Sequence, residues 1–217
     1  MSLSSVLAKV ALCQFLLSVM LHIFAFADGK IKSAKDANPK NNDGIIEKLD
    51  ESKLFTPAKG FIWQFLPEIN GAFQMPVKWH FLQATNDSQI VYYMTKENIE
   101  TEGSYKTGLS VNVIRKVKEK IGKDALKYAR EIVSEMIRNT DTLGTAVGQA
   151  STIYQYTCRS RIKGKEGLAM IVHNLAMANI TTDTFYLITF EFPESQYEET
   201  EKIARVMLVN FVLDDEI

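Results

Sequence analysis

The sequence predicts an α+β fold, an α/β/α sandwich in which helices flank a central, mainly antiparallel sheet. Three observations lead to this class. Stretches with the period-two alternation of strands occur in two groups. Two segments, 122–139 and 195–212, instead carry apolar residues at the spacing of an amphipathic helix. Strands and helices do not alternate along the chain, which argues against a parallel doubly wound sheet.

The first group of strands begins near Gly60. Two apolar runs come first, broken at Pro67 and at a following Asn-Gly pair. Apolar, aromatic and β-branched residues then predict strands over 77–82, 88–95 and 109–117.

The first helix is expected over 122–139. Its apolar residues share one face, and Asp124 has the short acceptor side chain that is preferred at a helix N-cap. The next stretch, TDTLGTAVGQ at 140–149, is predicted to be a turn-rich connection.

The second group contains three strands and is followed by the second helix. The strands are expected over 151–161, 167–180 and 184–192. Pro193 ends the last of them. Ser195 and Glu198 have the spacing of a capping box, which predicts that the second helix begins at Ser195.

The first 27 residues have the features of a secretory signal peptide. Lys9 precedes an apolar run without Asp, Glu, Lys or Arg, and small residues stand at the end of the run. This pattern predicts cleavage between Ala27 and Asp28. The alternative is an uncleaved membrane anchor, because the run approaches the ~20 residues of a spanning helix.

The remaining chain divides into two parts. Residues 28–59 are rich in Lys, Asn, Asp and Gly and are predicted to form a flexible tether. Residues 60–217 are predicted to form the folded domain. With the signal peptide, this organisation predicts a secreted, periplasmic protein.

Charge and cysteine content exclude two classes of protein. The formal net charge of the 217 residues is −1, and nucleic-acid binding calls for a clear basic excess. The chain has two cysteines, of which Cys13 lies in the signal peptide. Cys158 would then have no partner, so we expect no disulfide scaffold.

The stretch GSYKTGLS, at 103–110, resembles the phosphate-binding loop G-x-x-x-x-G-K-[ST]. Leu109 stands where that loop needs lysine. A phosphate loop also leads into a helix, whereas Gly108 precedes a strand-like run. We therefore interpret both glycines as turn residues of a connection between strands.

Candidate catalytic residues are few. His80 and His173 fall on separate strands without the spacing of metal ligands, so no metal and no cofactor is predicted. Cys158 and His173 could meet across neighbouring strands as a thiol–base pair. A small thiol-dependent enzyme or hydrolase that uses these two residues is therefore the alternative function.

A basic cluster lies at the end of the strand that contains Cys158. It comprises Arg159, Arg161, Lys163 and Lys165. Charged strand ends are usually solvated, and the alternative is a docking rim for an acidic partner or anionic headgroups.

Two stretches resemble bacterial PsbP-like proteins: YYMTKENIETEGSYKTGLSVNVI, with the helix after it, and LITFEFPESQYEETEKIARVMLVNFVLDDEI. Relatives of that family share their fold with the PsbP subunit of the photosynthetic oxygen-evolving complex and with a Ran-binding nuclear import factor. The resemblance covers about residues 60–217. It implies the sandwich described above and an accessory or binding role without catalysis, and it transfers no individual site residue.

The sequence thus favours a secreted, non-enzymatic PsbP-like binding module whose partner is an unidentified protein or small ligand. A thiol enzyme is the alternative. A membrane-anchored assembly factor is the third possibility, if residues 1–27 remain attached.

Overall fold

The computed structural model describes residues 54–85, 89–164 and 167–213. The predicted cleavage site at Ala27 and Asp28 and most of the predicted tether lie outside these ranges, as does Lys165. No helix of the described part is long and apolar enough to cross a membrane.

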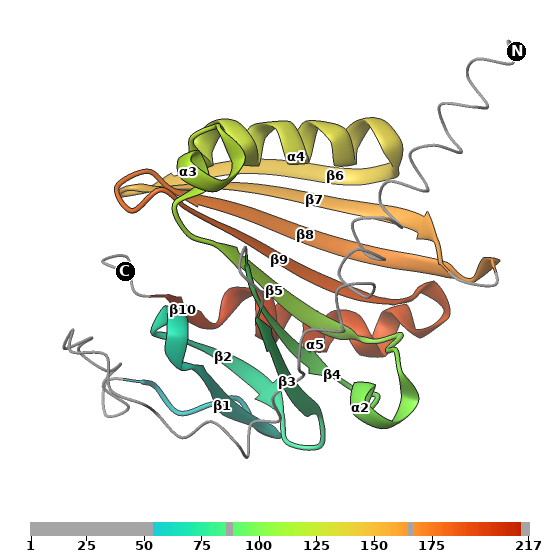
Figure 1. Cartoon of the computed structure of the whole chain (residues 1–217). Helices are drawn as coiled ribbons and strands as arrows, with labels where there is room; N and C mark the ends of the chain where they lie inside the picture. The colour runs from blue at the N-terminus through green and yellow to red at the C-terminus, as the bar shows by residue number, and fades with distance from the viewer. Residues whose placement is uncertain (1–53, 86–88, 165–166, 214–217) are drawn as a thin grey trace, which may run out of the picture.

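A seven-stranded sheet forms the centre of the molecule (Figure 1). Its spatial order is β3-β4-β5-β9-β8-β7-β6, and every neighbouring pair is antiparallel. The strands are β3 (His80–Thr85), β4 (Ile90–Thr95), β5 (Gly108–Ile114), β6 (Asp141–Ala150), β7 (Ile153–Lys163), β8 (Ala169–Asn179) and β9 (Thr184–Pro193). The predicted α+β class with a mainly antiparallel sheet is therefore confirmed.

A second, three-stranded sheet was not anticipated as a separate unit. It consists of β1 (Phe61–Leu66), β2 (Gly71–Pro76) and β10 (Phe211–Leu213), with β2 in the middle. The predicted break at Pro67 is a 3-10 turn, η2 (Pro67–Ile69), between the first two of these strands.

The two faces of the large sheet are covered by different elements. Helix α4 (Ala125–Asn139) packs on β7, β8 and β9, where Ala129 and Val133 meet Ala176 and Phe185. Helix α5 (Tyr197–Val209) and the small sheet cover the other face, where Ala204 joins the larger core. In Figure 1, α4 runs beside β6 and β7, whereas α5 lies behind β4 and β5.

Strand alternation explains why each face has its own core. Along β8, Leu175 and Met177 belong to the α5 side, whereas Ala176 and Ala178 belong to the α4 side. The α5 side carries the larger side chains. Those buried completely include Phe73, Tyr92, Leu109, Ile188, Phe190 and Met207.

Two short helices lie at strand ends. They are α2 (Ile99–Glu102) and α3 (Val117–Ile121). Gly103 ends α2 with a φ of 71°, a left-handed conformation that glycine adopts without strain. Gly108 begins β5, where an added Cβ would lie 2.6 Å from Thr95 Cγ2. The glycines of GSYKTGLS therefore serve a turn and a close strand contact, and a strand follows them.

The turn between β8 and β9 holds both α3 and α4. Asp183 has a φ of 51°, and its Oδ2 accepts a hydrogen bond from the Lys118 amide at 2.6 Å. Its Oδ1 accepts from the Ala125 amide at 2.8 Å. Asp124 caps α4 as predicted, since its side chain accepts from the Lys127 amide at 2.8 Å.

Three predictions of local structure are wrong. The second helix was expected to extend to residue 212, but α5 ends at Val209 and strand β10 follows. Residues 141–150 form strand β6, although 140–149 was expected to be a turn-rich connection. The capping box of Ser195 and Glu198 does not form, because a 3-10 turn, η4 (Glu194–Gln196), precedes α5. The N-cap is Gln196, without a side-chain capping bond.

Candidate functional site

Strand β6 is an unusually open edge of the large sheet. It is ten residues long, and within the part of the chain that the structure describes it pairs only with β7. Thr142 is half-buried, and the other nine residues are exposed. Val147 is the extreme case, with 73% of its surface accessible. An edge strand presents unpaired amide and carbonyl groups on every second residue, so β6 offers a row of free hydrogen-bonding groups.

The packing of the helices explains this exposure. Helix α4 lies mainly on β7 and β8, and α5 contacts β9 and β2. Neither helix covers β6 as it covers the inner strands. Strand β3 forms the opposite edge of the sheet and is shorter and less exposed than β6. It has six residues, and the four central ones are half-buried.

A shallow hollow of about 390 Å³ adjoins β6 on the α5 side of the sheet. Small side chains form the β6 part of its lining, at Ala146, Gly148 and Ala150. Ile153 and Met177 provide an apolar floor. We call the exposed residues of β6 together with this hollow the β6 surface.

The composition of β6 lacks the usual protection of an edge strand. Natural edges are blunted by charged side chains, prolines or bulges. The only bulge in β6 lies near its start, between Thr142 and Gly144. No charged residue and no proline occurs from Thr142 to Ala150. The strand can therefore accept an additional strand along most of its length.

The predicted thiol–base pair is not formed. Cys158 lies opposite Asn174, whereas His173 lies opposite Arg159. Because successive strand residues point to opposite faces, the Cys158 thiol faces the α4 side and the His173 imidazole faces the α5 side. Cys158 is also 1% exposed, and burial raises the pKa of its thiol. The sheet therefore separates the two groups on which the enzyme alternative depends.

His173 belongs instead to a charged cluster beneath α5. Its Nε2 lies 3.1 Å from Glu201 Oε2, although the pair lacks hydrogen-bond alignment. Burial lowers the pKa of His173, and the nearby Glu201 carboxylate opposes this shift. Arg159 donates to Tyr197 Oη at 2.5 Å from the neighbouring strand. These contacts attach the first turns of α5 to β7 and β8.

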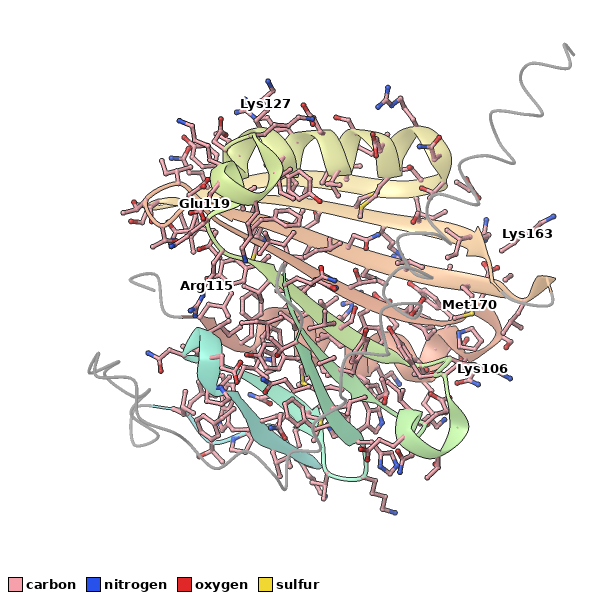
Figure 2. All side chains as sticks on the ribbon, in the orientation of Figure 1. Lys106, Arg115, Glu119, Lys127, Lys163 and Met170 are labelled. Atoms are coloured by element: carbon pink, nitrogen blue, oxygen red, sulfur yellow. The ribbon has the colours of Figure 1, made fainter. Side chains whose placement is uncertain are left out.

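Arg161 is also occupied by internal contacts. Its Nε approaches both carboxylate oxygens of Glu194, at 2.9 and 3.0 Å, and its Nη1 donates to Asp141 at 3.0 Å. Of the predicted docking rim, Lys163 remains exposed, and Figure 2 shows it at the end of β7, away from the sheet. Docking at the rim stays a prediction; the half-buried Arg159 and the exposed Arg161 both make contacts within the chain.

A half-buried acid on the α4 side, Glu191, was not anticipated. Glu191 interacts with the hydroxyl of Tyr105, which comes from the connection between α2 and β5. Burial raises the pKa of Glu191, and the Tyr105 hydrogen bond opposes this shift. Tyr105 also packs edge-on against Tyr93 with ring centroids 6.1 Å apart.

The described residues contain no cluster of three or more His, Cys, Asp or Glu side chains that could hold a metal ion.

The β6 surface was not predicted from the sequence because none of its residues belongs to a recognisable catalytic or binding motif. The absence of charge from 142 to 150 does not reveal it either, because the interior strand β8 is also without Asp, Glu, Lys and Arg.

Neither a protein-family model nor a curated protein matches this chain. Among solved structures, it is similar to cyanobacterial PsbP from Synechocystis, with 11% identity and a TM-score of 0.45, covering 71% of this chain and 93% of that one. It is also similar to the Ran-binding protein Mog1p of Saccharomyces cerevisiae, with 16% identity and a TM-score of 0.43, covering 70% and 95%. The sequence resemblance named proteins of the same two kinds.

Proposed function

We propose that this protein is a non-enzymatic binding module that takes up an extended segment of another protein as an additional strand beside β6. The observation that supports this most strongly is a ten-residue edge strand with nine exposed residues and no charge from Thr142 to Ala150. In this mode the main chain supplies affinity, and side-chain pockets supply selectivity.

The β6 surface indicates the chemistry of the partner. Val147 is open on the α4 side, while Ala146 and Gly148 leave room in the hollow on the α5 side. A segment that alternates larger apolar and small polar residues would fill the hollow with one face. We expect it to be uncharged at its centre, since β6 has no charge there to balance one.

Capture at residue 147 tests this proposal. A photoreactive amino acid replaces Val147 in the full chain, and the protein is irradiated in a native envelope extract. The matched control carries the same group at Val209 on α5, where a valine is 76% exposed. A partner that is crosslinked at 147 and not at 209 supports the proposal.

A charge variant then tests the strand edge itself. Val147→Lys places a lysine where natural edges carry one, and Val209→Lys is its control. We expect Val147→Lys to lower the affinity for the captured partner by about tenfold or more, because the charge would be desolvated in the complex. Equal binding by both variants would contradict strand addition, and self-association through β6 would identify a second copy as the occupant.

A further inference from the structure

A second hollow, of about 420 Å³, lies at the opposite end of the α5 side from the β6 surface. Its walls come from the β2–β3 turn, the facing ends of β4 and β5, and the first turns of α5. Trp79 and Ile203 are its largest apolar residues, and its polar residues are Lys78, Lys96, Thr107, Glu199 and Thr200. We call it the Trp79 hollow. Its volume is that of a site for a small organic molecule.

Trp79 packs against the larger core at this hollow. Its ring stacks on Phe190 with centroids 6.0 Å apart, and Phe190 is buried completely. The indole is itself only half-buried. A partly exposed aromatic ring that is packed on one side offers a platform for a flat apolar group.

The lysines give the hollow an excess of positive charge. Lys78 and Lys96 are exposed, and neither forms an ion pair within the described residues. Among the described residues of the lining, Glu199 is the one acid, against these two ammonium groups. An anionic group is therefore the favoured polar part of a ligand.

Thr107 supplies a third and independent indication. It is 2% exposed, it contributes to the lining, and its Oγ1 has no hydrogen-bond partner in the part of the chain that the structure describes. Its backbone is held firmly, since its amide donates to Glu97 at 3.1 Å and its carbonyl accepts from the Lys96 amide at 2.9 Å. A buried hydroxyl without a partner destabilises a fold.

From these features together we infer that the Trp79 hollow binds a small aromatic carboxylate. The aromatic ring of the ligand lies on Trp79, the carboxylate faces Lys78 and Lys96, and the Thr107 hydroxyl bonds a polar atom of the ligand. This site is separate from β6 and does not depend on strand addition.

Titration with phenylacetate tests the inference, with phenylacetamide as its neutral counterpart. The chain has two tryptophans, so a ¹⁵N-labelled sample gives two indole signals, and Trp63→Phe assigns them. We expect phenylacetate to shift the Trp79 signal and leave that of Trp63 in place. Phenylacetamide should bind about fivefold more weakly, because it lacks the charge. Equal shifts of both indoles, or no shift at Trp79, would overturn the site.

Two variants separate the contribution of the lysines to ligand binding from that of the Thr107 hydroxyl. Replacing Lys78 and Lys96 by glutamine should remove the preference for phenylacetate over phenylacetamide. Thr107→Val should weaken binding about fivefold while the free protein keeps or gains thermal stability, since an unpaired hydroxyl is lost. Lys127→Gln on the outer side of α4 is the control for charge (Figure 2). Loss of stability in Thr107→Val with unchanged binding would contradict the role of this hydroxyl.

Discussion

Replacing Asp183 with alanine tests how the β8–β9 turn organises two helices. The substitution removes the acceptors of the Lys118 and Ala125 amides, which lie in the first turns of α3 and α4. Each lost acceptor at a helix start destabilises a protein by about 1 kcal/mol. Alanine in the left-handed region adds about 1 kcal/mol, because its Cβ is crowded there. The sum is about 3 kcal/mol for Asp183→Ala.

Two further variants make this reasoning specific. Asp183→Gly loses both acceptors without the left-handed strain, so we expect a loss of about 2 kcal/mol. Asp183→Asn tolerates the same φ and keeps one acceptor oxygen, which predicts a loss of about 1 kcal/mol. Thermal unfolding of the full chain, followed by circular dichroism, should show midpoints that fall by about 6–12 °C for the alanine variant. An alanine variant within about 0.5 kcal/mol of the wild type, or a glycine variant less stable than alanine, would refute this account.

Three other predictions concern ionisable groups that are buried or half-buried. The free energy of unfolding should fall as the pH drops below about 6.5, because His173 is protonated more readily in the unfolded chain. Urea unfolding of His173→Gln should show a smaller decline of this free energy over the same pH range. Because the pKa of Glu191 is raised in the folded protein, its charged form opposes folding. Glu191→Gln should therefore be more stable than the wild type at pH 8, and the difference in stability should shrink as the pH falls. A glutamine variant that is less stable than the wild type at pH 8 would contradict this. Cys158 should react with a thiol reagent far more slowly in the native protein than in urea, and equal rates would show that it is accessible.

The predictable parts of the fold are those where one face of an element is buried. Helix α4 shows this well, because its apolar stripe and the Asp124 cap both report the same local geometry. Strand β9 behaves similarly, since Tyr186, Ile188 and Phe190 alternate toward the larger core. In each case burial of one face produces a periodic pattern of apolar residues in the sequence.

Strand β6 could not be found in this way. Periodicity arises when one face is buried, and nine of the ten residues of β6 are exposed. Gly144 and Gly148 also favour turns, so the composition of this stretch predicted a connection instead of a strand. Its pairing with β7 therefore comes from tertiary context, which overrides local preference.

The failure of the Cys158–His173 pair has a different origin. Alternation along each strand was evident, but the register between two strands is set by the turn that joins them and by the packing of both faces. The observed register places Arg159 opposite His173. A shift by one residue would have brought Cys158 opposite His173 on the same face, and the sequence does not distinguish the two registers.

Hydrogen exchange of the β6 amides tests the central claim most directly. The partner captured at residue 147 is purified, and exchange is measured across the full chain with and without it. Strand addition predicts that alternate amides within 141–150 become protected in the complex, whereas those of α5 do not change. Unchanged exchange in β6 in the presence of saturating partner, or protection confined to other elements, would contradict binding by strand addition.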